Sequence, residues 1–318
     1  MELESFIAAS ALQNRHPFSF WPEVEEGDFA RYLCKEISKL SFDPFISQLP
    51  SGDEIRAYPI RLDWDSDFFG YPCHKIVFVG LAGEPLESKG AELATQRAKL
   101  EKWFENFLES TQAEFVFADI PSLDSNSNFL LQEIGFRYVL TWVNGFMNTS
   151  GLDLESRGLQ KLRFGEISAR DYDQAISLIR KSYFKGGRFF LDHGFLNRGA
   201  DVNNLYSCLI ENAARDGQRL RGIFENEKLI SLFLVTQPKR IATTDFSSLR
   251  LFATDQDFRG RGLAQMGLKE CLNEIKSTVK IFNSGLEVHN IESLNFHRSF
   301  GFKYNFLHNA YHFWRKKL

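Results

Sequence analysis

The chain from Tyr58 onward alternates between strand-like and helix-like hydrophobic patterns. Residues 113–120 are a dense β-branched and aromatic run, typical of a buried parallel strand, and they follow a predicted helix over 92–110. In the second half, the pattern predicts a regular series of further elements. These are a strand at 161–164, helices at 169–181 and 201–214, a hairpin at 219–235, a strand at 248–253, a helix at 262–276, a strand at 280–288, a helix at 291–300 and a strand at 310–314.

Two segments repeat the same pattern without gaps, residues 124–138 and 290–304. Each follows a strongly apolar strand, has the spacing of a short helix, and ends in Gly-Phe before another strand. This shared context indicates two related units in tandem. The coinciding pairs are Ser127/Ser293, Gly135/Gly301, Phe136/Phe302 and Tyr138/Tyr304.

The fold class predicted from these patterns is mixed α/β, with a mixed central sheet flanked by helices in each unit. We expect an N-terminal extension over 1–57 whose role the sequence does not indicate, a first unit over 58–150 and a second over 158–318. The first unit has no Gly-x-Gly turn before its long helix, and it carries Leu131 where the second has His297. The second unit is therefore expected to carry the chemistry, and the first to be degenerate.

Length, composition and charge restrict the class of protein, but they do not indicate which reaction it catalyses or which ligand it binds. A length of 318 residues suits two domains, and the net charge of −3 gives no electrostatic footprint for nucleic acid. The start of the chain carries acidic residues where a signal peptide needs basic ones, and no apolar stretch is long enough to span a bilayer. We therefore expect a cytoplasmic protein with no membrane partner and no bound metal; the sequence is compatible with an oligomer.

The clearest candidate for a binding site is the turn Arg259-Gly260-Arg261-Gly262-Leu263-Ala264, between a predicted strand and a predicted helix. Glycines at a helix start let backbone N–H groups approach a phosphate, and arginines add charge-assisted hydrogen bonds. Taken alone, the pattern is equally explained by an ordinary helix N-terminus. The strand before it and the strand–helix pair after it favour an anion site.

The turn, followed by Asn290, Ser293, His297 and Gly301-Phe302, resembles the acetyl-CoA signature of the GNAT superfamily over about residues 160–318. The resemblance implies acetyl-CoA as the acyl-donor cosubstrate and a sheet splayed between its fourth and fifth strands. It also implies that backbone groups of Leu251, Phe252 and Ala253 pair with the pantetheine arm like an added strand. Asn290 and Ser293 complete the implied cosubstrate site.

Three segments are similar to the dTDP-fucosamine N-acetyltransferases: 62–72, 187–206 and 309–315. This resemblance implies a nucleotide-linked amino sugar as the acceptor, within glycan biosynthesis. The alternatives are that the aromatic residues are core, that Asp65 caps a turn, and that Arg188 forms a surface ion pair. The acceptor residues implied are Trp64, Asp65, Phe68, Phe69, Arg188, Phe189 and Asp192.

The residue at the proton-transfer position departs from the family pattern, because His297 stands where the family usually has a tyrosine that protonates the leaving thiolate. An imidazole can donate or accept a proton near neutral pH, but it can equally be a hydrogen-bonded helix residue. Tyr304 and Tyr311 are further candidate donors, and Glu287 or His289 candidate bases. No Cys-His or Ser-His-Asp set suggests a covalent acyl-enzyme, so direct attack by the amine in a ternary complex is expected.

Three functions remain open at this point. The first is an N-acetyltransferase that acts on a nucleotide-linked amino sugar. The second keeps the acetyl-CoA site but takes an amino acid, a peptide or a polyamine as the small-molecule amine. The third is an inactive CoA-binding protein, suggested by the missing tyrosine.

Overall fold

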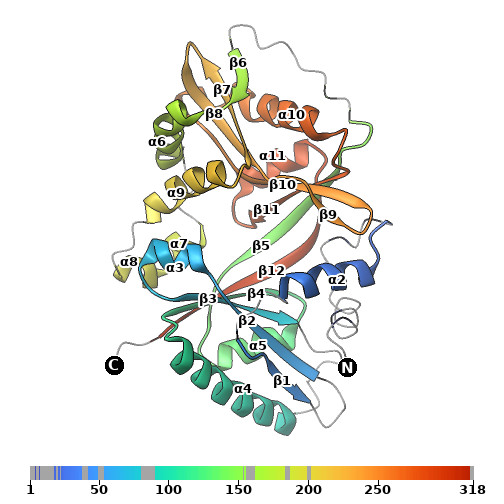
Figure 1. Ribbon diagram of the computed structural model, residues 1–318, viewed down its shortest axis with the longest axis vertical. Coiled ribbons are helices and arrows are strands. Elements are labelled where there is room, and N and C mark those ends of the chain that lie inside the picture. Colours follow the sequence, from blue (N-terminus) through green and yellow to red (C-terminus); the bar gives the residue numbers. More distant parts are fainter. Residues whose placement is uncertain are drawn as a thin grey trace. The chain divides into compact units, whose positions relative to one another are not determined.

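A computed structural model gives the architecture of the chain (Figure 1). It describes residues 23–37, 42–48, 54–79, 90–152, 162–182, 187–198 and 202–315, together with residues 4, 7, 18, 21 and 154. Parts of the predicted extension 1–57, and part of the stretch 151–157 between the two predicted units, lie outside these described residues. The contacts divide the chain into two compact units, Met1–Val143 with Asn305–Leu318, and Asn144–Tyr304.

The second unit is built on a mixed sheet in the order β11-β10-β8-β7-β6, with β9 beside β10 and the end of β5 beside β11. β8 is the central strand, and its residues after Lys228 are buried on both faces of the sheet. The strands are β6 (Leu162–Glu166), β7 (Arg219–Glu225), β8 (Lys228–Val235), β9 (Lys239–Ile241), β10 (Thr244–Thr254) and β11 (Ile281–Glu287).

Helices cover both faces of this sheet (Figure 1). On one face α10 packs Leu268 and Leu272 against Phe233 of β8, and α11 adds Phe296 and Phe300 to the same cluster. On the other face α6 and α9 pack against alternate residues of β8 and β10. The helices are α6 (Tyr172–Ser182), α7 (Arg188–Leu191), α8 (His193–Asn197), α9 (Val202–Arg215), α10 (Leu263–Ile275) and α11 (Ile291–Ser299).

β10 and β11 are parallel but pair only over their first halves. The register runs from Phe246 opposite Ile281 to Leu249 opposite Ser284, and stops there. β10 continues to Thr254, where its other edge is still paired antiparallel with β8. The splay implied by the sequence resemblance is thus present, and beyond Leu249 it leaves one edge of β10 without a neighbouring strand among the residues that the structure describes.

The first unit has the sheet order β1-β2-β3-β4-β12, with the start of β5 beside β12. α4 and α5 pack on one face over Val116, Ala118 and Ile120, whereas α2 packs Ala30 and Ile37 against Tyr58. The elements are α2 (Glu26–Ile37), β1 (Phe45–Gln48), β2 (Glu54–Arg61), α3 (Asp63–Phe69), β3 (Cys73–Val79), α4 (Gly90–Thr111), β4 (Phe115–Pro121), α5 (Ser125–Glu133), β5 (Arg137–Asn148) and β12 (Lys303–Trp314).

The internal repeat has the same local geometry in both units. The side chain of Asp124 accepts a hydrogen bond from Ser127 N at 3.0 Å, and that of Asn290 accepts one from Ser293 N at 3.1 Å. Gly135 and Gly301 follow the helices with φ of 95° and 83°, values that a side chain strongly disfavours. The predicted fold class, tandem mixed α/β units, is confirmed.

The last strand of the chain belongs to the first unit rather than to the second. β12 runs antiparallel to β4, with Ala310 opposite Asp119 and Trp314 opposite Phe115. The second unit is expected over 158–318, whereas the contacts place residues 305–318 with the first unit, because β12 pairs with β4. Strand partners depend on register over long sequence separation, which hydrophobic periodicity does not encode.

A buried histidine should make the first unit sensitive to acid. His74 is 1% exposed, lies against the rings of Phe42 and Phe107, and has no hydrogen-bond partner among the described residues. Burial, aided by the Arg61 cation, lowers the pKa of His74 to about 4. The unfolded chain, with a pKa near 6.5, therefore binds this proton first, so the stabilising contribution is complete above about pH 6.5 and is lost as the pH falls towards 4.

Urea unfolding at pH 7.5 and 4.5 checks this expectation. The His74→Phe variant should lose less stability over this range than the wild type, by a few kcal/mol at most. His193→Phe, at an exposed histidine, is the control and should follow the wild type. If the His74→Phe and wild-type proteins lose stability equally, His74 is not a source of the acid sensitivity.

Candidate acyl-donor site

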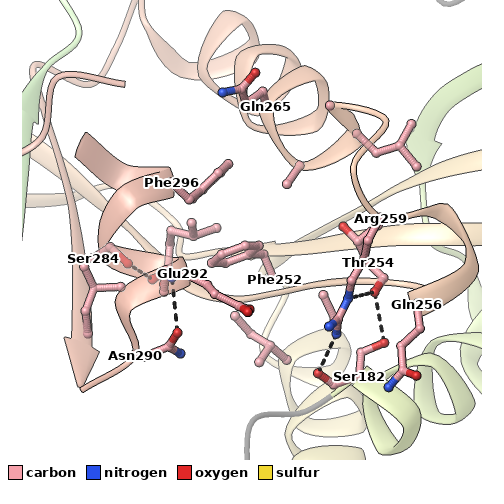
Figure 2. A pocket seen from close by; sticks show the side chains of 18 of the residues that line it. Ser182, Phe252, Thr254, Gln256, Arg259, Gln265, Ser284, Asn290, Glu292 and Phe296 are labelled. Carbon is pink, nitrogen blue, oxygen red and sulfur yellow. Dashed lines mark hydrogen bonds between the residues drawn. The ribbon is translucent and has the colours of Figure 1, made fainter. Parts of the chain in front are cut away.

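A cavity of about 700 Å³ lies in the second unit, where β10 and β11 diverge (Figure 2). β10 contributes Leu249 to Thr254, β11 contributes Ser284 to Glu287, and α11 contributes Asn290, Ser293 and Phe296. The turn after β10 closes the same cavity with Arg259, Gly260, Gly262, Leu263 and Ala264. Of the predicted cosubstrate residues, only Arg261 does not line this cavity.

The turn before α10 exposes backbone donors. Gly260 and Gly262 have φ of 75° and 74°, and no atom lies within 4 Å of where a Cβ would stand. Gly262 is the N-cap of α10, and no side chain from the described parts of the chain caps this helix. Among these residues the first N–H groups of α10 therefore have no intrahelical or side-chain capping partner, and the helix dipole adds partial positive charge there. An oxyanion of phosphate type fits both features.

The two arginines of the turn already contact protein groups. Arg259 donates to Thr254 O at 3.4 Å and to Ser182 O at 3.2 Å, which ties the turn to the end of β10 (Figure 2). Arg261 pairs with Glu225 at 3.0 Å. The carbonyl groups that Arg259 contacts are neutral, so they do not neutralise its positive charge, and this charge lies at the cavity. The charge of Arg261 is neutralised by the carboxylate of Glu225.

Aromatic rings form the wall between β10 and α11. Phe252 stacks on Phe296, with ring centroids 4.8 Å apart, and both line the cavity (Figure 2). Beside them, Asn290 caps α11 through Ser293 N, so the predicted cosubstrate residue Asn290 also has a structural role. These contacts fix the start of α11 next to the open edge of β10.

His297 lies behind this wall and is 0% exposed. Its Nδ1 is 2.7 Å from Ser293 O, so this nitrogen carries the proton, and Nε2 has no partner among the described residues. Burial lowers the pKa of His297 to about 4, which keeps the ring neutral at pH 7. The surroundings favour the packing alternative, and proton donation by His297 stays a prediction.

The two candidate tyrosines are also engaged away from the cavity lining. Tyr304 donates to Leu294 O at 2.8 Å, and Tyr311 donates to Asn128 Oδ1 at 2.7 Å. Burial raises the pKa of both phenols. Tyr311 belongs to the core of the first unit, so neither phenol is placed at the cavity by its own contacts.

The candidate acceptor residues are divided between the units. In the second unit Phe189 is buried against Phe195, and Asp192 caps α8 through Gly194 N at 2.8 Å. Arg188 is half-buried, with its guanidinium 4.5 Å from the centre of the Phe189 ring. These contacts give Phe189 and Asp192 structural roles in the α7–α8 segment.

In the first unit, the aromatic residues of the predicted acceptor segment 62–72 lie on and beside the short helix α3. Trp64 and Phe68 stand one helical turn apart and stack at 5.8 Å, and Phe69 stacks on Tyr71 at 5.6 Å. All of these rings are half-buried. The four-residue spacing of Trp64 and Phe68 places their rings on one face of the helix. Asp65 lies in the first turn of this helix.

Several residues that line the cavity carry no signal in the sequence. Glu287, a candidate base, lines the cavity together with Glu292. Arg250, Ser284, Gln265 and Phe296 line it too, and the sequence does not indicate them, because the cavity forms where β10 and β11 separate. Within the described ranges, no group of at least three metal-ligating side chains is found, and no helix is long and apolar enough to cross a membrane.

Comparison with known proteins agrees with this geometry. Residues 196–302 match the model of the acetyltransferase (GNAT) family. A GCN5-related N-acetyltransferase from Sphaerobacter thermophilus has a similar fold, with a TM-score of 0.62, 12% identity, and coverage of 99% of this chain and 92% of that one. None of the curated proteins matches the sequence.

Two further structures share the fold. A tandem GNAT protein from the clavulanic acid biosynthesis pathway gives a TM-score of 0.51 at 11% identity, covering 99% and 95% of the two chains. A GCN5-related glucosamine N-acetyltransferase region of a fungal β-N-acetylglucosaminidase gives 0.55 at 14% identity, covering 97% of this chain and 37% of that one. The chain thus has the fold of GNAT acetyltransferases, and the segment that builds most of its cavity matches their family.

Proposed function

We propose that the second unit is an acetyl-CoA-dependent N-acyltransferase. One observation carries the proposal: the open edge of β10 and the uncapped N-terminus of α10 face the same cavity. The first can bind an extended amide-containing arm, and the second a diphosphate, which are the two recognisable parts of CoA. The family match over 196–302 supports the same donor.

The open edge of β10 also offers a means of polarising a carbonyl. Leu251, Phe252 and Ala253 pair with β8 on one side only, so backbone groups directed to the other side face the cavity. A backbone N–H at Phe252 or Ala253 would donate to the thioester oxygen as negative charge develops there. Because these groups are fixed by the sheet, they need no rearrangement during the reaction.

The reaction forms a bond from the amine nitrogen to the acyl carbon and breaks the bond from that carbon to sulfur. The amine loses one proton and the thiolate gains one. A thiol has an ordinary pKa near 8.5, so the thiolate can take its proton from water without a dedicated donor. Tyr304, Tyr311 and His297 remain candidate donors.

Glu287 is the group that we propose accepts the proton of the amine. It is half-buried at the end of β11, where it lines the cavity across the splay from β10. Glu287→Gln should lower kcat by roughly 10²-fold or more, the usual contribution of general-base catalysis. Steady-state release of the CoA thiol measures this.

Glu292→Gln is the matched control, because Glu292 lines the same cavity from the exposed first turn of α11. It should retain kcat within a few-fold, and both variants should bind acetyl-CoA. Equal activity of the Glu287→Gln and wild-type enzymes would exclude Glu287 as the base.

We propose a nucleotide-linked amino sugar as the acceptor. In the second unit, the half-buried cation of Arg188 supports it, since a guanidinium binds the phosphates of a nucleotide. An amino acid, peptide or polyamine is the second candidate, because the donor site does not depend on the acceptor.

A thermal-shift screen with dTDP and UDP tests the acceptor. A Tm rise that grows with nucleotide concentration supports the sugar nucleotide. No response to either nucleotide would remove this acceptor and leave the second candidate. Acetyl-CoA binding without thiol release for any amine tested would indicate the inactive CoA-binding alternative.

A further inference from the structure

Arg250 stands at a break in the pairing of β10. Val235 is opposite Leu249 and Leu234 is opposite Leu251, so Arg250 is an extra residue in the strand. Such a bulge turns a side chain away from the regular alternation of a sheet. The break coincides with the last pair between β10 and β11, Leu249 opposite Ser284, so Arg250 lies where the two strands begin to separate.

The guanidinium of Arg250 has an unusual environment for a surface cation. The residue is exposed and lines the cavity, and yet the surrounding protein lowers its pKa by reducing its hydration. A concave site explains both the exposure of Arg250 and its lowered pKa, because water reaches the side chain from one side only. Within the described parts of the chain, no carboxylate pairs with Arg250.

Another cation also acts on Arg250. Arg188 adds to the lowering of the Arg250 pKa. Because like charges repel each other, an anion bound by Arg250 would offset this unfavourable interaction. The arginines at the donor turn, by comparison, contact Ser182 O, Thr254 O and Glu225.

We propose that Arg250 binds an anionic group of the acceptor, either a carboxylate or a phosphate. The inference rests on the proposed acyltransferase function and narrows its acceptor to an amine that carries negative charge. A neutral amine or a polyamine would place no negative charge opposite Arg250.

The donor's own phosphates are a poor occupant of this position. The turn that fits a diphosphate begins after Thr254, and Arg250 lies four strand residues earlier, about 13 Å along β10. Arg250 is therefore at the end of the cavity where the acyl group, and hence the incoming amine, would lie.

Isothermal titration of the full chain saturated with CoA tests the proposal, because CoA keeps the diphosphate site filled. The probes are inorganic pyrophosphate, dTDP and succinate. Wild type should bind at least one; binding of only the first two identifies a phosphate group, and binding of succinate a carboxylate. Arg250→Gln should weaken that binding about 10- to 100-fold, as expected for a charged hydrogen-bonded pair, while the Kd for CoA stays unchanged. The affinity of Arg250→Lys for the same anion should lie between those of the wild type and Arg250→Gln.

Arg240→Gln is the matched control, because it removes an exposed guanidinium of β9 that is paired with Asp245 and does not line the cavity. It should bind every probe like the wild type. The proposal is overturned if Arg250→Gln binds the anions as tightly as the wild type, or if the wild type binds none of the three probes. If Arg250→Gln instead binds CoA more weakly, Arg250 belongs to the acyl-donor site. If CoA itself does not bind, the acyltransferase function fails, and the anion titration is read on the CoA-free protein.

Discussion

Replacing Gly262 by aspartate should weaken acetyl-CoA binding by about 10²-fold or more. The new carboxylate would stand at the uncapped start of α10, where the N–H groups are expected to hold the diphosphate. Loss of charged hydrogen bonds at this turn costs about 1.5–3 kcal/mol, and repulsion between like charges adds to it. The Kd from titration with acetyl-CoA measures the effect.

The control for Gly262→Asp is Gly217→Asp. Gly217 has a φ of 64° and no atom near its Cβ position, so aspartate suffers similar backbone strain there, about 1–2 kcal/mol. It does not line the cavity, and its Kd for acetyl-CoA should match that of the wild type. If both variants lose affinity equally, strain rather than the phosphate site is responsible.

Replacing Gly267 by alanine should destabilise the second unit by about 1–3 kcal/mol, although alanine is the better helix former. A Cβ at Gly267 would lie 2.0 Å from Cε2 of Phe233, a ring that is 0% exposed in the core of β8. The glycine therefore allows α10 to approach the sheet and places its N-terminus at the cavity. Urea unfolding gives the change in stability.

A double-mutant cycle with Phe233→Leu identifies the cause. The smaller side chain should make room, so the double variant should be more stable than the sum of the single changes predicts. Gly27→Ala is the control, because Gly27 lies in helix α2 and, among the described residues, its Cβ would meet only the flexible end of Arg31, at 3.5 Å. If the stability changes of the two single variants simply add up in the double variant, contact with the Phe233 ring is not the cause of the destabilisation by Gly267→Ala.

The sequence predicted the regular elements of the second unit because their hydrophobic periods are clear. The helix over 262–276 corresponds to α10, and the strand over 280–288 to β11. The turn was found because Gly260 and Gly262 need a left-handed backbone, which glycine alone adopts readily.

Other features depend on long-range contacts and leave no local signal. The bulge at Arg250 arises from the register with β8, and the burial of His297 from the aromatic rings packed around it. The final strand was expected at 310–314, but β12 begins at Lys303 and pairs with β4. None of these partners can be predicted from the spacing of apolar residues along one segment.

Hydrogen–deuterium exchange with and without acetyl-CoA tests the central claim most directly. Binding should protect amides of residues 250–254 and 259–265, the open edge of β10 and the turn with the start of α10. Residues 124–128 of the first unit, which match the start of α11 in the internal repeat, should exchange at the same rate in both states, because they do not line the cavity. Binding that leaves 250–254 and 259–265 unprotected, or no binding at all, would contradict the account.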